Sequence, residues 1–421
     1  MSSNELFNSK TDPIPEVRRN IDIIPIEDKG HSYLYFHDSL GYAAPDFALD
    51  RQVAPLLSLL DGSKSIQDLS PYLGENVTTD QLLQYIRFLD ENRLLQSSHF
   101  KKYAEQVEQQ YEQSDTHEAV TPGLSYPENP VELRNYLDKA FSAVDTPKTQ
   151  NKQTAAKALY APHIDPRVGM ETYAQAFSAI RHLEPKRVVI LATSHYASLY
   201  RDAYRNDPFI VSRKDFKLPT GTIPSDKEAI EKLVSENSKN GLTDRDRAHR
   251  IEHSIELPLL FLRYLWDHNF SIVPVLVSGL DDLMYMKDGH RARQIEKFGK
   301  SLQKHFGSDS DTFFLISGDL AHIGKKFGDP KPAREMFDEV KSFDERFLAK
   351  GEQAEAEALL EMVSEQYDPY RICGFPPLYT FLKSISGLEG QTLNYDLWDE
   401  HERESAVSFG SILYWNTDKS N

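Results

Sequence analysis

From residue 121 onward, short apolar runs alternate with stretches of helical periodicity. The runs at 157–161, 186–193 and 311–317 are continuous and apolar, as expected of strands that are buried on both faces. Stretches such as 226–237 and 294–306 repeat apolar residues at spacings of three and four, which predicts amphipathic helices. This alternation predicts an α/β domain with a mostly parallel sheet flanked by helices.

The N-terminal part of the chain follows a different pattern. Two apolar runs, 21–26 and 32–36, flank a polar turn and predict a β-hairpin. Three stretches with apolar residues at helical spacing follow, which predicts a small α+β module of the winged-helix type. The predicted organisation is a flexible leader over residues 1–20, the module over 21–98, a linker over 99–120 and the α/β domain over 121–421.

The composition narrows the class of protein. The formal net charge is −17 and the pI about 5.3, so the chain's overall field repels phosphate backbones and we expect no nucleic-acid partner. The single cysteine, Cys373, excludes a disulfide within the chain and any cysteine-rich metal site. The polar start has no apolar signal segment, and no apolar run approaches the roughly 18 residues of a membrane span. We therefore expect a cytoplasmic protein without a membrane partner.

Polar side chains follow several of the predicted strands. His163, His195 and Asp319 each come just after a strand, and His322 lies slightly further on. Because ligands of open α/β sheets bind outside the carboxyl ends of the strands, we expect these side chains to meet in one crevice. His253, at the start of a predicted helix, is a fifth candidate. Imidazoles bind zinc, iron and copper, two histidines with a carboxylate suit Fe(II), and a further histidine can act as acid or base.

The same residues also have structural interpretations. A histidine at a strand end is often a hydrogen-bonding residue of the core, and Asp319 is able to cap the following turn. Cys373 has the surroundings of a small buried apolar residue rather than those of a nucleophile. The sequence contains no Gly-rich phosphate loop and no Gly-x-Ser-x-Gly elbow, so nucleotide binding and serine-esterase chemistry are not supported.

Several motifs of the α/β domain resemble those of one known family. They are LYAPHIDP (159–166), VVILATSHY (188–196), EHSIELPLLFL (252–262), SGDLAHIGKKF (317–327) and ICGFPPLYTFL (372–382). In this order they resemble the Memo family, and in particular its bacterial branch called AmmeMemoRadiSam system protein B. The resemblance covers residues 121–421 and is specific in the combination of its motifs.

The resemblance implies a fold, a cofactor and partners. The family is similar in fold to class III extradiol dioxygenases, which hold Fe(II), and its members have been proposed to bind iron or copper. His163 and His195 match the ligand positions, and His253 matches a histidine that lines the same pocket. We expect acid–base roles for His253 and His322. The family's third ligand, a cysteine, is Ala321 here. We expect Asp319, His322 or the added carboxylate Asp165 to supply the third metal ligand instead of this cysteine. The implied partners are a radical SAM protein and an AMMECR-like protein.

The N-terminal module resembles PqqD-like domains. The residues that carry this resemblance are APLLSLLDGSKSIQDL (54–69) and LLQYIRFLDENRLL (82–95). The resemblance implies that the module binds an extended peptide by strand addition. A small helical accessory or dimerisation domain is the alternative.

Three functions stay open at this level. The first is a metal-dependent redox enzyme with His163 and His195 as ligands. The second is a metal-free binding or scaffold protein that presents a peptide or small molecule to a partner enzyme, which Ala321 and the N-terminal module favour. The third is a hydrolase or lyase that uses the pocket histidines without metal, although no nucleophile stands out.

Overall fold

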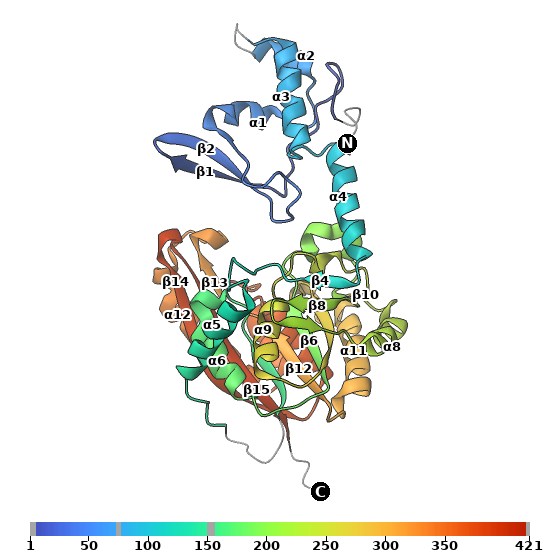
Figure 1. Cartoon of the computed structure of the whole chain (residues 1–421), viewed down its shortest axis with the longest axis vertical. Helices are drawn as coiled ribbons and strands as arrows, with labels where there is room; N and C mark the ends of the chain where they lie inside the picture. The colour runs from blue at the N-terminus through green and yellow to red at the C-terminus, as the bar shows by residue number, and fades with distance from the viewer. Residues whose placement is uncertain (1–5, 73–76, 150–155, 418–421) are drawn as a thin grey trace. The chain divides into compact units, whose positions relative to one another are not determined.

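The computed structural model of the protein describes residues 6–72, 77–149 and 156–417 (Figure 1). The chain forms two compact units, Met1–Gln113 and Ser114–Asn421. The segment 99–120, predicted as a linker, consists mainly of helix α4 (Ser98–Glu112) in unit 1 and strand β4 (Thr116–Glu118) in unit 2. None of the helices in the described ranges combines the length and apolar character that a bilayer crossing demands.

Unit 1 is a small antiparallel sheet with helices. The strands β1 (Asp22–Asp28), β2 (His31–His37) and β3 (Ala48–Asp50) lie in this order, followed by α1 (Ala54–Leu59), α2 (Ile66–Leu69) and α3 (Thr79–Glu91). Capping boxes start α2 and α3, in which Ser65 pairs with Asp68 and Thr78 with Gln81. The predicted hairpin and three helices are therefore confirmed, whereas the short strand β3 was not predicted.

The N-terminal segment packs on unit 1, which differs from the prediction of a flexible leader over residues 1–20. Ile14 is buried in the core of the unit. The buried guanidinium of Arg18 pairs with Asp38 at 2.8 Å and donates to the Arg93 carbonyl at 2.9 Å. Charged residues suggested exposure, but a charge that is paired with an opposite charge can be buried. Residues 1–5 of the predicted leader lie outside the described part of the chain.

Unit 2 is built on a nine-stranded sheet in the order β10-β7-β11-β6-β12-β5-β15-β13, with β14 paired to β15. The four central strands β11, β6, β12 and β5 run parallel, while β7, β15, β13 and β14 add antiparallel pairs at the margins. A mostly parallel sheet flanked by helices was predicted and is confirmed. The strands are β5 (Ala156–Ala161), β6 (Arg187–Thr193), β7 (Phe209–Val211), β10 (Leu242–Thr243), β11 (Ser271–Val277), β12 (Thr312–Ser317), β13 (His322–Gly324), β14 (Leu388–Glu400) and β15 (Ser405–Asn416). Strand β4 pairs with β8 (Asp215–Leu218) and β8 with β9 (Gly221–Ile223) in a separate small sheet.

Helices cover both faces of the large sheet. Successive strand residues point to opposite faces, so Tyr160 and Leu191 enter one hydrophobic core whereas Leu159 and Ile190 enter the other. The first core is closed by α8 (Lys227–Asn237), α11 (His290–Leu302), α12 (Phe337–Glu352), α13 (Ala356–Ser364) and α14 (Phe375–Ser384). The second core is closed by α5 (Pro130–Ser142), α6 (Pro166–Ser178) and α9 (Glu256–Leu265). Two short helices, α7 (Arg201–Tyr204) and α10 (Asp282–Tyr285), complete the unit.

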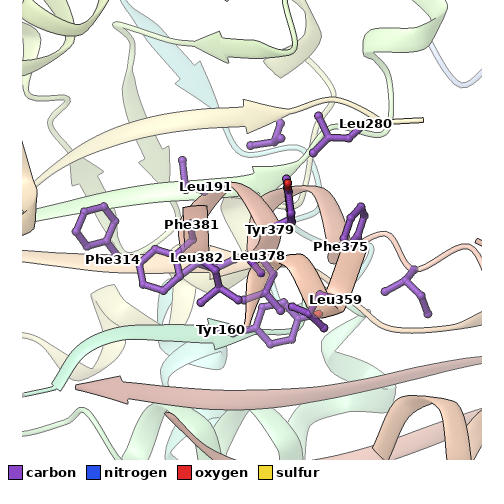
Figure 2. Close-up of a cluster of buried hydrophobic side chains, with 14 of the residues drawn as sticks. Tyr160, Leu191, Leu280, Phe314, Leu359, Phe375, Leu378, Tyr379, Phe381 and Leu382 are labelled. Carbon is purple, nitrogen blue, oxygen red and sulfur yellow. The ribbon is translucent and has the colours of Figure 1, made fainter. Parts of the chain in front are cut away.

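Helix α14 matters most for the site, because its packing fixes the loop in front of it. Its residues Phe375, Leu378 and Phe381 recur at helical spacing and are buried. They pack on the sheet beside Tyr160 of β5 and Leu191 of β6 (Figure 2). The loop that precedes α14 is thereby held at the carboxyl ends of the parallel strands.

Candidate metal centre

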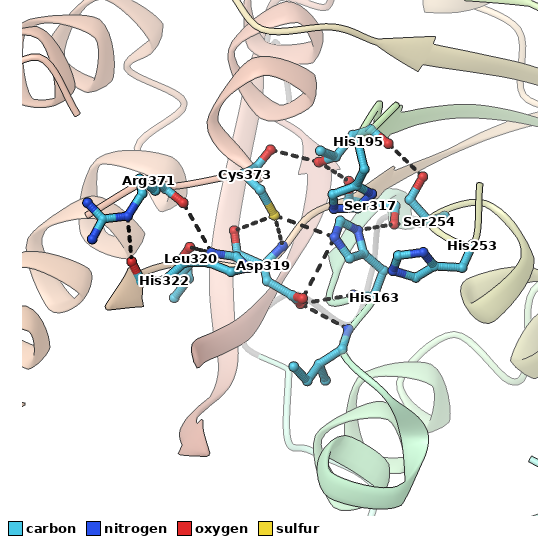
Figure 3. Close-up of polar contacts among 12 residues, drawn as sticks. His163, His195, His253, Ser254, Ser317, Asp319, Leu320, His322, Arg371 and Cys373 are labelled. Carbon is cyan, nitrogen blue, oxygen red and sulfur yellow. Dashed lines mark hydrogen bonds and ion pairs between the residues drawn. The ribbon is translucent and has the colours of Figure 1, made fainter. Parts of the chain in front are cut away.

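Three neighbouring strands deliver polar side chains to one edge of the large sheet. The strands lie in the order β6-β12-β5 and run parallel. His195, Asp319 and His163 each lie two residues beyond the end of their strand. With His253, just before α9, His163 and His195 form a group whose ligand atoms lie within 4.8 Å of one another (Figure 3). The structure thus brings these four predicted residues to one site.

The neighbours of His163 define its tautomer. His163 Nδ1 lies 3.2 Å from Ser317 Oγ. The Ser317 hydroxyl donates its only proton to the Ser254 carbonyl at 2.6 Å, so it accepts from His163 Nδ1–H. Nε2 therefore carries the lone pair and faces the other site residues. Burial and the neighbouring imidazoles hold the pKa of His163 well below its usual range, so the ring is neutral.

Glu252 orients His195. The buried carboxylate accepts from His195 Nδ1 and from the His195 backbone N–H, each at 2.8 Å. Burial alone would lower the pKa of His195, but the Glu252 carboxylate raises it well above its usual value. Burial likewise opposes ionisation of Glu252, yet His195 lowers the pKa of that carboxyl to about 2. The two side chains therefore form an ion pair in which His195 Nε2 points away from the carboxylate.

His253 completes the rim of the site. Its ring stacks on that of His195, with centroids 4.9 Å apart and planes at 10°. Its backbone N–H donates to Glu252 Oε1 at 3.1 Å, so one carboxylate positions both histidines. Burial and the neighbouring His195 lower the pKa of His253 to about 4, which leaves its imidazole neutral at pH 7. The side chains of His195 and His253 are 28% and 29% exposed, whereas His163 is 2% exposed, so the site opens to solvent beside the first two.

Asp319 and Cys373 form a second group around His163. One oxygen of the buried Asp319 carboxyl accepts from the backbone N–H groups of His163 and Ile164 at 2.9 and 3.2 Å. The other lies 3.7 Å from His163 Nε2, and Cys373 Sγ lies 3.4 Å from the same nitrogen. Burial raises the pKa of Asp319 to about 7 and also raises the pKa of the Cys373 thiol. The ligand atoms of His163, Asp319 and Cys373 also lie within 4.8 Å of one another.

Two glycines let the Asp319 and Cys373 loops approach. A Cβ added to Gly318 would lie 2.2 Å from Gly374 Cα, and one added to Gly374 would lie 2.7 Å from the Asp319 carbonyl oxygen. Both positions therefore exclude any side chain. The Gly374 N–H donates to the Asp319 carbonyl at 2.8 Å, which fastens the two loops together.

Asp165 and His322, two further residues predicted for the site, lie outside both groups among the described residues. Asp165 caps the start of α6 and forms an ion pair with Arg167 at 2.7 Å. His322 Nδ1 lies 3.1 Å from each of the carbonyl oxygens of Leu320 and Arg371, so it carries a proton and donates to the backbone. Both residues are engaged in local structure.

Sequence reasoning did not assign Glu252 or Cys373 to the site. Glu252 stands directly before His253, and a carboxylate next to a candidate histidine is a signal for an orienting residue. Cys373 gave no such signal, because a cysteine that fills a core and one that faces a histidine look alike in sequence. Ala321 is fully buried and offers no ligand atom.

Comparisons with known proteins identify the family of the chain. The family model described as Memo-like protein matches residues 117–413. A MEMO1 family protein of Aquifex aeolicus is 27% identical over 413 residues, which cover 95% of this chain and 100% of the relative. A MEMO1 family protein of Thermus thermophilus is 28% identical over 292 residues (69% of this chain, 80% of the relative), and Protein MEMO1 of Mus musculus is 24% identical over 285 residues (66% and 86%).

The family match begins at residue 117, so the likeness of unit 1 to PqqD-like domains stays a prediction. The similarity to the Aquifex protein nevertheless extends into unit 1, because it spans nearly the whole chain. The match of the family model over more than half of the sequence shows that this chain belongs to the Memo family.

Proposed function

We propose that unit 2 is a non-haem metal-dependent redox enzyme that acts on a small molecule, with His163 and His195 as metal ligands. The observation that supports this most is the state of the two imidazoles. Each has its Nδ1 occupied, by Ser317 in one case and by Glu252 in the other. Each therefore turns Nε2 toward the site, as the hydrogen-bonding partners of ligand histidines commonly do. His163 Nε2 already carries a lone pair, whereas His195 Nε2 would release its proton on binding an ion.

The donor set suits iron or copper. Two groups that share His163 offer imidazole, carboxylate and thiol donors, and such a mixture of nitrogen, oxygen and sulfur serves Fe(II) and copper as well as zinc. An iron or copper ion would supply one-electron chemistry and polarise a bound oxygen atom. The similarity of the Memo family to class III extradiol dioxygenases favours a redox reaction.

The chain's own residues would handle substrate and protons. The exposed side of the site lies beside His195 and His253, so a substrate would enter there. The His253 imidazole is neutral at pH 7, because its pKa is lowered to about 4, so it can accept a hydrogen bond from a bound substrate. Its stacking on His195 and its link to Glu252 fix the ring for that role.

Metal analysis tests this proposal. Protein purified anaerobically, without a metal-binding tag, would be analysed by mass spectrometry for iron, copper and zinc. Wild type would be compared with His163→Ala and His195→Ala, and with His401→Ala, an exposed histidine, as the matched control. We expect near-stoichiometric iron or copper in wild type and the control, and loss of it in both site variants. Wild type that stays metal-free after anaerobic loading would contradict the proposal.

A second candidate function is a metal-free scaffold that presents a peptide to a partner, such as a radical SAM protein or an AMMECR-like protein. Unit 1 supports it with an apolar groove of about 520 Å³, lined by Val53, Leu56, Leu59, Leu69, Leu82 and Tyr85 among others. The edge strand β1 also exposes Ile23, Ile24 and Ile26. An exposed edge strand suits an added peptide strand, and an apolar groove suits the apolar side chains of a bound peptide.

Partner capture tests this second function. A pull-down with the full chain would be compared with Leu56→Asp in the groove and with Leu199→Asp, an exposed leucine of unit 2, as the control. Capture of a radical SAM or AMMECR-like protein that depends on Leu56 but not on Leu199 would support the scaffold. Capture that is indifferent to both, or absent in wild type, would count against it.

A further inference from the structure

We infer that Cys373 supplies the sulfur ligand of the metal ion, beside His163 and Asp319, and so replaces from a different loop the thiol that Ala321 lacks. The inference rests on the metal binding proposed above. It concerns the chain's only cysteine, which sequence reasoning treated as a core residue. If it is correct, this chain retains a thiol in the site although the thiol occupies a different place in the sequence.

The distances around His163 Nε2 match those between atoms that share one ion. Metal–nitrogen bonds of about 2.0–2.1 Å and metal–sulfur bonds of about 2.3 Å, at a tetrahedral angle, place nitrogen and sulfur about 3.5 Å apart. Cys373 Sγ lies 3.4 Å from His163 Nε2, and an Asp319 carboxyl oxygen lies 3.7 Å from it (Figure 3). Small shifts would therefore bring all three atoms to bonding distance of a single ion.

The surroundings of the sulfur are polar, which distinguishes it from a cysteine that fills a core. Its sulfur accepts from the Asp319 backbone N–H at 3.2 Å and lies 3.7 Å from the carbonyl oxygen of the same residue. The imidazole of His163 lies 3.4 Å from the sulfur, so donors and acceptors from two loops contact it. A divalent ion would also balance the charges of one thiolate and one carboxylate, which burial otherwise disfavours.

The thiol is held in place from two strands. The carbonyl of Cys373 accepts from Thr193 Oγ1, at the end of β6, at 2.7 Å. The next residue, Gly374, donates to the Asp319 carbonyl, beyond β12, at 2.8 Å. The backbones of the two loops touch at Gly318 and Gly374, and no side chain would fit between them. A ligand held this way is ordered before the ion arrives, as metal sites require.

Cobalt binding tests the inference directly. The full chain would be loaded anaerobically with Co(II), and bound metal would be quantified by mass spectrometry while the near-ultraviolet thiolate-to-cobalt absorption is recorded. Cys373→Ala and Cys373→Ser would be measured alongside, with thermal unfolding as the check of the fold. We expect wild type to show the thiolate absorption, and both variants to lose it together with at least about tenfold in affinity.

The single cysteine allows a second test that needs no variant. Alkylation of wild type reports on Cys373 alone, since the chain has no other thiol. We expect bound Co(II) to slow alkylation and a chelator to restore its rate. Cobalt bound at full stoichiometry without thiolate absorption, and with unchanged alkylation, would overturn the inference and leave the proposed function standing. Protein that takes up no cobalt, iron or copper would overturn both.

Discussion

Replacing Glu252 with glutamine tests how far the site depends on one buried carboxylate. Glu252 accepts from His195 Nδ1 and from the His195 N–H at 2.8 Å, and from the N–H groups of His253 and Ser254 at 3.1 Å. Glutamine has the same shape, but one of its terminal atoms is a donor. At least one of the four N–H groups therefore loses its acceptor and faces another donor.

The size of the stability loss can be worked out from the ion pair between Glu252 and His195. The fall of the Glu252 pKa from 4.5 to about 2 corresponds to roughly 3 kcal/mol of stabilisation. In the variant His195 can lose its proton, which limits the cost, so we expect the free energy of unfolding to fall by about 1–3 kcal/mol. Metal affinity should fall about 10–100-fold, because His195 loses the group that orients it.

The two pKa shifts predict how the stability difference between wild type and Glu252→Gln varies with pH. The lowered pKa of Glu252 means that its contribution is present above pH 4.5 and is lost as the pH falls toward about 2. The raised pKa of His195 means that its contribution is present below about pH 6.5 and is lost as the pH rises through the folded-state value. The stability difference between wild type and Glu252→Gln should therefore be largest between about pH 4.5 and 6.5.

Denaturant unfolding at several pH values, together with metal titration, would measure both effects. Glu256→Gln is the matched control, because Glu256 is equally buried but accepts from Thr121 and Tyr126 instead of a histidine. It should lower stability without changing metal affinity. If Glu252→Gln kept wild-type metal affinity, or if its stability difference did not vary with pH, the role assigned to the carboxylate would be refuted.

Three further predictions concern the loops and the core. Gly374→Ala would place a Cβ 2.1 Å from Tyr160 Oη, so we expect stability to fall by about 1–3 kcal/mol and metal affinity to fall at least about tenfold. Metal titration checks this beside the control Gly279→Ala, where an added Cβ meets nothing nearer than 3.4 Å, and equal behaviour of the two variants would contradict it. Burial raises the pKa of Asp344 to about 7, so the contribution of this residue to stability should fall as the pH rises from 3.8 to about 7. Asp344→Asn removes that contribution, so its stability relative to wild type should rise over this range, and a difference that stays constant with pH in denaturant unfolding would disprove the perturbation. Leu378 is a buried residue of α14, so Leu378→Ala should lower the free energy of unfolding by about 2–5 kcal/mol, as measured by chemical denaturation. The exposed Leu199→Ala should stay within about 0.5 kcal/mol of wild type, and a similar cost at both leucines would argue against the α14 packing.

The central part of the fold could be predicted because its signals are local. The apolar runs that became β5, β6 and β12 are continuous, and α8 and α11 have clear helical spacing. Strand β14 was not predicted, although Leu393, Tyr395 and Leu397 alternate with polar residues, because this alternation covers only five of its 13 residues. The packing of Ile14 in unit 1 was missed for a related reason, since one apolar residue in a polar segment has no periodicity.

The site residues that could be predicted from the sequence are mainly those that closely follow a strand. His163, His195 and Asp319 follow predictable strands, and the rule that such ends meet at one edge brought them together. Cys373 arrives from a loop more than 200 positions along the chain from His163, and its place depends on the packing of α14 and on the contact of two glycines. No local pattern encodes either of those contacts.

The order of strands β6, β12 and β5 has a consequence for how the protein folds. During synthesis the central strand β12 emerges last of the three, and it pairs with two strands that were made well before it. His163 and His195 therefore lack Asp319 between them until this long-range pairing forms, which is a slow step in sheets of high contact order. Metal uptake would then report the completion of the sheet rather than its beginning. Bound metal would mainly lower the unfolding rate, since it stabilises contacts that form late.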